Sequence, residues 1–212
     1  ELKDGRKVEC CEDHLWTVAK ESHGTTVECT MSTKEMYEKG VIRVKNSVTS
    51  GLHHQSKYWL PRVMPMESEE VQQPIDPWLL GYLIGNGSLS MRPRICFCTT
   101  DAYVLDRIRH TIPNEIHDSG NNLLYYIHQP AELRYWIEYL KLDVKSHEKH
   151  IPQQYKCGSL KQRTEILRGL MDSDGTCAKN GTASYSTVSK QLAEDVQDVA
   201  RTLGFSVTIS LD

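Results

Sequence analysis

The chain has 212 residues, of which 39% are hydrophobic and 25% are charged, a composition typical of a folded globular protein and not of a disordered or fibrous one. No apolar run approaches the roughly 18 residues that a membrane span needs, and Glu1 to Asp4 do not begin a secretory signal. The net charge of −3 argues against a uniformly basic nucleic-acid binder, although one cleft can still be locally positive.

The cysteines indicate the compartment. There are seven of them, an odd number, and none has the C-x-x-C spacing of a structural zinc site or a redox motif. We therefore expect a reducing, intracellular location, the cytoplasm, with no membrane association.

The first 56 residues are expected to be mostly β. Short β-prone runs at 8–10, 15–18, 25–29 and 41–44 are interrupted by turn signals at Asp4-Gly5 and His23-Gly24. Residues 32–38 begin with Ser32 and carry Glu35 three positions later, which predicts a short helix with a capping box.

A connector is predicted over residues 57–75, with a domain boundary near residue 74. Prolines at 61, 65, 74 and 77 oppose helix formation, and an acidic stretch lies between them. Asp76 followed by Pro77 then marks the start of a helix that ends at Asn86-Gly87. The predicted elements that follow are a strand at 95–99, a helix at 102–111, a strand at 123–128 and an amphipathic helix at 131–140.

The chain contains an internal repeat. Residues 79–87, LLGYLIGNG, match residues 167–175, LRGLMDSDG, 88 positions later, and a small hydroxyl residue follows each copy. A strand at 183–188 and a helix at 190–203, ended by Gly204, are predicted after the second copy. The repeat therefore predicts two similar halves related by a pseudo-twofold axis.

Small residues in each copy suggest how the two helices meet. Gly81 and Gly85 lie four positions apart on one helix, as do Gly169 and Ser173 on the other, so that the two backbones can approach closely. Close packing would bring the two helix ends together.

Asn86 and Asp174 would then lie side by side as oxygen ligands for Mg²⁺ or Mn²⁺, together with the preceding residues Gly85 and Ser173. Plain helix packing is the alternative for either copy taken alone. A calcium loop at Asp172-x-Asp174-Gly175 would lack its first and last acidic ligands.

The paired motifs resemble those of the LAGLIDADG homing endonucleases, in the form found inside inteins. The segments at 148–155 and 184–193, followed by Leu203-Gly204, resemble further blocks of that family. The resemblance covers about residues 74–210. It implies an α+β fold in which an αββαββα half occurs twice, over residues of about 76–150 and 151–212, with the second half truncated.

The same resemblance implies a function. Family members bind long sites on double-stranded DNA with β-sheet saddles and cut both strands with divalent metal ions held by an acidic residue at the end of each motif. Those positions are Asn86 and Asp174 here, and Lys149 corresponds to the basic residue near the scissile phosphate. Because Asn86 has no negative charge, we expect double-strand cleavage by this chain to be impaired.

The N-terminal segment, residues 1–56, resembles part of the Hint splicing domain of inteins. The family motif T-x-x-H becomes Cys11-x-x-His14, in which the imidazole would polarise the scissile amide during an acyl shift. Since the sequence begins at Glu1 and ends without His-Asn, we expect no splicing by this chain alone. A structural role for His14 is the alternative.

Basic side chains that contact DNA are expected at Arg92 and Arg94 after the first motif, at Lys179 after the second, and at Lys145 in the basic cluster before it. Each of them taken alone is equally explained as a solvated surface charge. Three hypotheses therefore remain: a metal-dependent endonuclease domain, a DNA-binding module that no longer cleaves, and an inert insertion in a splicing element. The expected partners are DNA and the host protein, or extein, and two motifs in one chain make a monomer sufficient.

Overall fold

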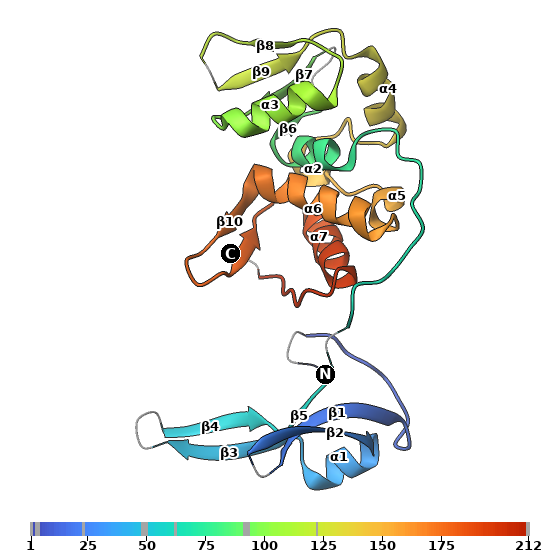
Figure 1. Cartoon of the computed structure of the whole chain (residues 1–212), viewed down its shortest axis with the longest axis vertical. Coiled ribbons are helices and arrows are strands. Elements are labelled where there is room, and N and C mark those ends of the chain that lie inside the picture. The colour runs from blue at the N-terminus through green and yellow to red at the C-terminus, as the bar shows by residue number, and fades with distance from the viewer. Residues whose placement is uncertain are drawn as a thin grey trace. The chain divides into compact units, whose positions relative to one another are not determined.

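The computed structural model describes residues 2, 5–22, 24–47, 51–61, 63–90, 94–121 and 123–210. Within them the fold is mixed α+β, with small antiparallel sheets and seven α-helices (Figure 1). The elements are β1 (Leu15–Ser22), β2 (Thr25–Ser32), α1 (Thr33–Lys39), β3 (Ile42–Ser47), β4 (Gly51–Ser56), β5 (Tyr58–Trp59), α2 (Pro77–Asn86), β6 (Gly87–Ser88), β7 (Ile95–Cys98), α3 (Ala102–Thr111), β8 (Ile116–Asp118), β9 (Leu124–Ile127), α4 (Ala131–Tyr139), the 3-10 helix η1 (Ser146–Glu148), α5 (Gln153–Lys156), α6 (Leu160–Asp174), β10 (Gly175–Cys177), β11 (Ala183–Tyr185) and α7 (Lys190–Thr202).

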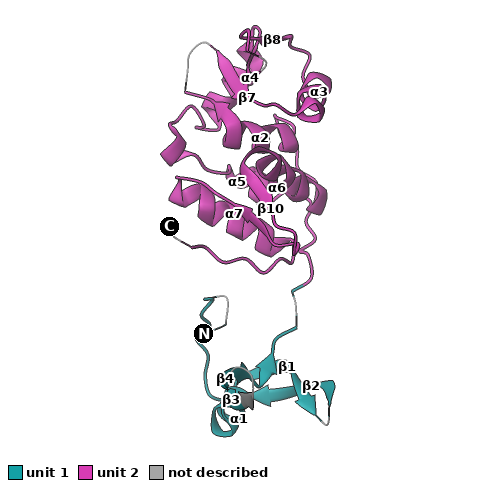
Figure 2. Ribbon diagram, turned by 90° about the vertical axis from the view of Figure 1, so that its left-hand side faces the viewer, with its two compact units in different colours: residues 1–63 teal, residues 64–212 magenta. Residues whose placement is uncertain are grey.

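Two units make up the chain, residues 1–63 and residues 64–212 (Figure 2). In the described part of either unit, no helix has the length and apolar character that crossing a membrane requires.

The first unit is built from two hairpins and a short helix. Strands β1 and β2 pair along their whole lengths, β5 pairs with β1, and β3 pairs with β4. Helix α1 has the predicted capping box, in which the Ser32 side chain accepts from the Glu35 backbone N–H and the Glu35 carboxylate accepts from Ser32. The β-prone run at 8–10 forms no strand, since no described strand pairs with it.

The predicted connector is partly structured. Its first residues form β5, and residues 60–76 contain no helix or strand among those described. From Met64 onward the segment belongs to the second unit, where the Met66 N–H donates to the Thr202 carbonyl at 2.9 Å and the Met66 carbonyl accepts from the buried Arg163 guanidinium. The polar backbone of an extended segment is thereby satisfied.

Helix α2 starts the second unit as the sequence predicts. The Asp76 side chain accepts from the Leu79 N–H at 2.9 Å, Pro77 occupies the first turn, and Gly87 follows the last helical residue, Asn86. The helix then feeds a four-stranded antiparallel sheet of order β6-β7-β9-β8, whose inner face is buried. Of this sheet, β8 was not predicted, because its sequence IHD is short and has no clear alternation of apolar and polar residues.

After α6, a shorter version of the same order recurs as the hairpin β10-β11 and helix α7. Strand β11 is shorter than predicted and ends at Tyr185. The described residues after α7, 203–210, form neither strand nor helix.

Helices α2 and α6 pack against each other through glycines (Figure 1). A Cβ atom added to Gly81 would lie 2.2 Å from the Ile166 carbonyl oxygen, and one added to Gly169 would lie 2.0 Å from the Trp78 carbonyl oxygen. The contact is reciprocal, since 81 and 169, like 78 and 166, are 88 positions apart. Only residues without a side chain allow two backbones to come this close.

Candidate functional site

The two central helices end next to each other. A Cβ atom on Gly85 would lie 1.8 Å from the Ser173 hydroxyl oxygen and 3.2 Å from Oδ2 of Asp174. The Asn86 amide donates long hydrogen bonds of 3.4 Å to the Ser173 carbonyl and to the Tyr82 hydroxyl. The structure thus brings together the four residues at the helix ends that the repeat singled out.

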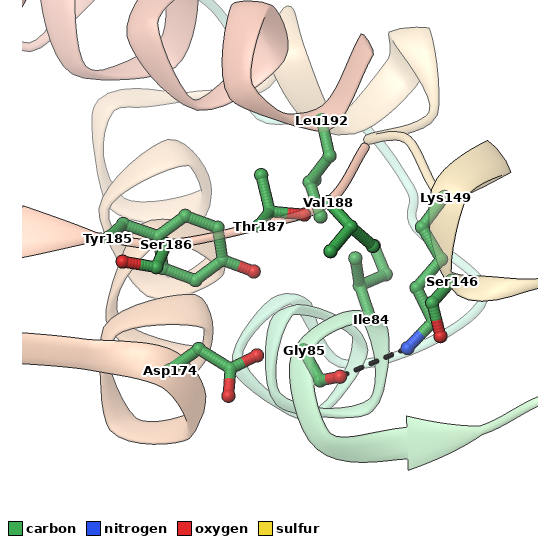
Figure 3. A pocket seen from close by; sticks show the side chains of 10 residues that line it. All are labelled: Ile84, Gly85, Ser146, Lys149, Asp174, Tyr185, Ser186, Thr187, Val188 and Leu192. Carbon is green, nitrogen blue, oxygen red and sulfur yellow. Dashed lines mark hydrogen bonds between the residues drawn. The ribbon is translucent and has the colours of Figure 1, made fainter. Parts of the chain in front are cut away.

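Lys149 is buried at the same place, with 6% of its surface exposed. Its Nζ donates to the Gly85 carbonyl at 3.0 Å (Figure 3) and also to the Gly87 carbonyl at 2.9 Å. Burial lowers the pKa of Lys149, while the negative charge of Asp174 acts in the opposite direction. The ammonium group therefore holds the end of α2 and places a positive charge beside it.

The segment that carries Lys149 is fixed by α7. The Ser189 hydroxyl, at the N-cap of α7, donates to the Lys149 carbonyl at 2.6 Å. The carboxylate of Asp195, on the same helix, is buried and accepts from the Ile151 N–H at 2.8 Å and from the Lys156 Nζ at 2.6 Å. A buried carboxylate satisfied in this way gives the segment a defined position.

Two cavities adjoin Lys149. The first has a volume of about 370 Å³ (Figure 3). It is lined by residues of α2, α6, β11 and the segments next to them, namely Ile84, Gly85, Ser146, Lys149, Asp174, Tyr185, Ser186, Thr187, Val188 and Leu192. The second, of about 350 Å³, is lined by Gly87, Ser88, Leu89, Ser90, Val144, Lys145, Ser146, His147 and Lys149. Lys149 and Ser146 border both cavities, so that one ammonium group can act on ligands in either.

Asp174 and Tyr185 face the first cavity. Partial burial raises the pKa of Asp174 and the Lys149 ammonium lowers it, while the Asp174 residue remains exposed to solvent. Burial raises the pKa of Tyr185, and the Asp174 charge adds to that rise. The Tyr185 phenol is therefore protonated at neutral pH and is available as a hydrogen-bond donor.

A Mg²⁺ ion held at the helix ends would have few protein ligands and would keep part of its water shell. Asp174 supplies the one carboxylate among the residues lining the first cavity. The Gly85 carbonyl already accepts from Lys149, and the Ser173 carbonyl from Asn86. No group of three or more His, Cys, Asp or Glu side chains in the described ranges could hold a metal. Mg²⁺ commonly takes one or two protein carboxylates and completes its shell with water and substrate phosphates.

The other predicted DNA contacts are spread over the second unit. Lys145 is exposed and lines the second cavity. Arg94 is exposed, with its guanidinium 5.3 Å from the centre of the Tyr126 ring, and Lys179 is exposed in the turn between β10 and β11. Arg92 lies outside the described residues.

His14 belongs to the first unit. Its backbone N–H donates to the Cys11 carbonyl at 3.3 Å, and its carbonyl accepts from the Thr33 N–H at 3.0 Å. Its exposed ring meets the Trp16 ring edge-on at 4.8 Å, and the Trp16 indole donates to the Thr33 hydroxyl at 2.9 Å. The backbone between Cys11 and His14 is thus a hydrogen-bonded turn beside β1.

Sequence reasoning missed Tyr185, Ser146 and Asp195. Tyr185 was detectable in principle, because the position 88 residues earlier is Phe97 and the hydroxyl group is the difference between them. Ser146 and Asp195 act through contacts between segments that are distant in sequence, and no local pattern indicates such contacts.

Comparison with known proteins identifies a family signal in the second half of this site. Residues 161–212, which include all of α6 but its first residue, and Asp174, match the family model of the LAGLIDADG-like domain. Three proteins named "Replicative DNA helicase DnaB" are similar to the chain. The one from Mycobacterium intracellulare is 44% identical over 57 residues, 27% of this chain and 10% of the relative. Those from Synechocystis sp. and Nostoc sp. are 25% and 26% identical over 96% and 72% of this chain, and over 26% and 20% of their own lengths. The chain thus spans about a quarter or less of each relative.

Proposed function

We propose that the chain is the DNA-cleaving domain of an intein inserted in a DnaB-type replicative helicase, and that it hydrolyses DNA at a specific site with a divalent metal ion. The observation that carries this proposal is the meeting of Asp174, Asn86 and buried Lys149 at the ends of two glycine-packed helices, beside two cavities. The match of residues 161–212 to the LAGLIDADG-like domain supports it.

Each residue of the site has a role in this proposal. The Asp174 carboxylate would hold Mg²⁺ or Mn²⁺, which when bound lowers the pKa of water and neutralises phosphate charge. Lys149 keeps the end of α2 in place and offers a positive charge to a phosphate in either cavity. The Asn86 amide keeps the pseudo-symmetric position polar without attracting a second cation.

One carboxylate at this centre favours cleavage of one strand. Double-strand cutting with a metal at each helix end would need a negative charge at both positions, and residue 86 is neutral. We therefore propose that the chain nicks its target at the phosphate nearest Asp174.

The face of the β6-β7-β9-β8 sheet that points away from the core, on which Tyr126 and His117 are half-buried and Cys96 is buried, is the proposed DNA-binding surface of the first half. In the pairing register Cys96 lies opposite Tyr126 and Tyr126 opposite His117, so that the three share one row, with the Arg94 guanidinium over the Tyr126 ring. Their inner neighbours Phe97 and Ile127 face the core. A basic and aromatic row of this kind can contact phosphates and base edges.

The remaining assignments complete this proposal. Residues 1–56 are proposed as the Hint-like splicing segment that contains His14, residues 57–75 as the connector, and residues 76–212 as two pseudo-symmetric endonuclease halves of which the second is truncated. The partners are a long site on double-stranded DNA and the helicase extein, and the chain acts as a monomer. Their support is the similarity to DnaB relatives and the repeat.

Supercoiled-plasmid conversion tests the proposal. The plasmid carries the DnaB helicase coding sequence with the segment for this chain removed, and the reaction contains Mg²⁺ or Mn²⁺. The wild-type chain is expected to give nicked circles and Asn86→Asp linear DNA, because the second carboxylate supplies the missing charge. EDTA controls should give neither product. Scission that persists without a divalent metal contradicts the proposed chemistry.

A second candidate is a DNA-binding module that does not cleave. The contact of Lys149 with the Gly85 and Gly87 carbonyls favours it, since the one buried ammonium group of the site is already engaged. This function predicts salt-sensitive binding to the same sequence, with supercoiled DNA left intact by both the wild-type chain and Asn86→Asp.

A further inference from the structure

Each half of the repeat places one tyrosine near its helix-end residue, but from a different element. In the first half Tyr82 is on α2 and Phe97 is on β7. At the positions 88 residues later, Leu170 is on α6 and Tyr185 is on β11. The tyrosine hydroxyl is therefore on the helix in the first half and on the strand in the second, while the strand position is aromatic in both.

In the first half, the Tyr82 hydroxyl group both donates and accepts a hydrogen bond. Tyr82 Oη donates to the Cys98 carbonyl at 2.7 Å, and its oxygen accepts from the Asn86 amide at 3.4 Å. Because the proton of Tyr82 is committed to Cys98, its lone pairs suit a neighbour that donates. An asparagine amide is such a neighbour.

In the second half, the Tyr185 hydroxyl group differs in this respect. Tyr185 Oη is buried and, among the described residues, has no hydrogen-bond partner. Figure 3 shows the Tyr185 side chain on the same side of the first cavity as Asp174. A buried polar group without a partner is costly, and an ionised carboxylate accepts hydrogen bonds but donates none. An acceptor in the first cavity, such as the Asp174 carboxylate, would satisfy the Tyr185 hydroxyl as a donor.

We propose that Tyr185 is a positioning residue whose hydroxyl donates a hydrogen bond to the Asp174 carboxylate when the site binds a metal ion. This inference rests on the proposed function, since it assigns Asp174 as the metal ligand. With one carboxylate oxygen held by the phenol, the other is oriented toward the ion. Outer hydrogen bonds of this kind orient metal-binding carboxylates and strengthen their hold on the metal.

The test compares Tyr185→Phe with the matched control Tyr155→Phe. The hydroxyl of Tyr155 is also buried, but it accepts from the Ile75 N–H at 3.0 Å and donates to the Ile75 carbonyl at 2.9 Å, away from the cavity. Mn²⁺ binding to the whole chain is measured by electron paramagnetic resonance of the unbound ion. We expect roughly 10–100-fold weaker binding for Tyr185→Phe, with an unchanged or higher melting temperature. Tyr155→Phe should melt earlier and bind Mn²⁺ as the wild-type chain does.

Two further readouts separate this inference from the proposed function. At saturating Mg²⁺ the nicking rate of Tyr185→Phe should recover toward the wild-type rate, and its DNA affinity should stay within about twofold of wild type. Equal Mn²⁺ affinity of the wild-type chain and Tyr185→Phe overturns the positioning role, as does a fall in melting temperature that matches that of Tyr155→Phe. Weaker Mn²⁺ binding by Tyr185→Phe in a chain that cuts no DNA supports the inference and overturns the cleavage proposal alone.

Discussion

The two halves of the second unit follow the same backbone plan. The N-caps of α3 and α7, Asp101 and Ser189, have φ and ψ of −89° and 116° in one half and −89° and 115° in the other. Two residues before each cap, the hydroxyl of Thr99 or Thr187 accepts from the N–H of the cap residue, at 3.0 and 3.1 Å. All these pairs are 88 positions apart, so the repeat extends well past the nine-residue motif that reveals it.

The two halves differ in the charge of the side chains at equivalent positions. Asn86 and Asp174 occupy equivalent helix ends, one neutral and one acidic. Arg107 and Asp195 occupy equivalent positions on α3 and α7, but Arg107 pairs with Glu165 on α6 at 2.5 Å, whereas Asp195 binds the segment that holds Lys149. The helix caps and the central helix contact are thus alike in the two halves, whereas the charged side chains at equivalent positions differ. The acidic helix end, Asp174, is thereby in the second half, while Lys149 is in the first half and its segment is held by α7 of the second.

The largest expected effect comes from making the helix ends alike. Asp174→Asn gives both halves an amide, and the single-turnover nicking rate should fall about a thousandfold, or about 4 kcal/mol in the barrier. The exposed Asp198 on α7 provides the control, and Asp198→Asn should cut at the wild-type rate. Nicking by Asp174→Asn within about threefold of wild type would mean that the metal site lies elsewhere.

The second-largest expected effect is on the free energy of unfolding, when the charged residue at the equivalent position of α7 or α3 is removed. Asp195→Ala leaves the Ile151 N–H and the Lys156 ammonium without their buried acceptor, and should lower the free energy of unfolding by about 3 kcal/mol in urea titrations. Arg107→Ala removes a half-buried ion pair and should cost less, about 1–2 kcal/mol. The reverse ranking would contradict the division of roles between the two helices.

A third effect tests the reciprocal helix contact. Gly81→Ala places a methyl group against the Ile166 carbonyl and should destabilise the chain by about 2 kcal/mol, after the better helix propensity of alanine is included. Gly85→Ala meets the Ser173 side chain, whose Oγ can rotate away but whose Cβ, 2.5 Å from the added atom, moves only with its backbone; because no backbone atom lies in the way, this change should cost less. Thermal unfolding of both variants measures the difference, and equal melting temperatures would show that the backbones have room to separate.

The smallest effect is a pH dependence that comes from the buried Lys149. Because burial lowers the pKa of Lys149 below 10.5, the unfolded chain binds more protons than the folded chain between the two pKa values. The contribution of Lys149 to stability should therefore increase as the pH rises through that interval. Urea unfolding at neutral and alkaline pH should show the wild-type chain gaining stability relative to Lys149→Met. A constant difference between the two would contradict the burial of a charged Lys149.

Local signals predicted the elements of the second unit well. The cap at Asp76 with Pro77 gave the start of α2, the run 102–111 gave the bounds of α3, and the small residues at 81 and 169 predicted a close helix contact. Such features depend on residues within one or two turns of each other, and the sequence displays them directly.

The features that were missed depend on distant contacts. Strands β4, β5, β6, β8 and β10 were not predicted, and the strand expected at 8–10 did not form, because pairing with a neighbour decides whether a short run becomes a strand. Likewise, the burial of Lys149 depends on Ser189 and Asp195, some 40 residues later. The metal ion and the DNA contacts stay predictions that the experiments above test.

The glycine-packed contact also has a consequence for synthesis on the ribosome. Helix α2 is apolar on nearly every side, and Trp78, Leu79 and Leu80 are almost wholly buried in the folded chain. Its partner α6 is completed only when Asp174 has been added, close to 90 residues later, which at about 5–20 residues per second takes roughly 5–20 s. For that interval the side of α2 that faces α6 has no partner, although β6 and β7 can already cover another side, so the yield in cells should depend on chaperones that bind apolar segments during translation.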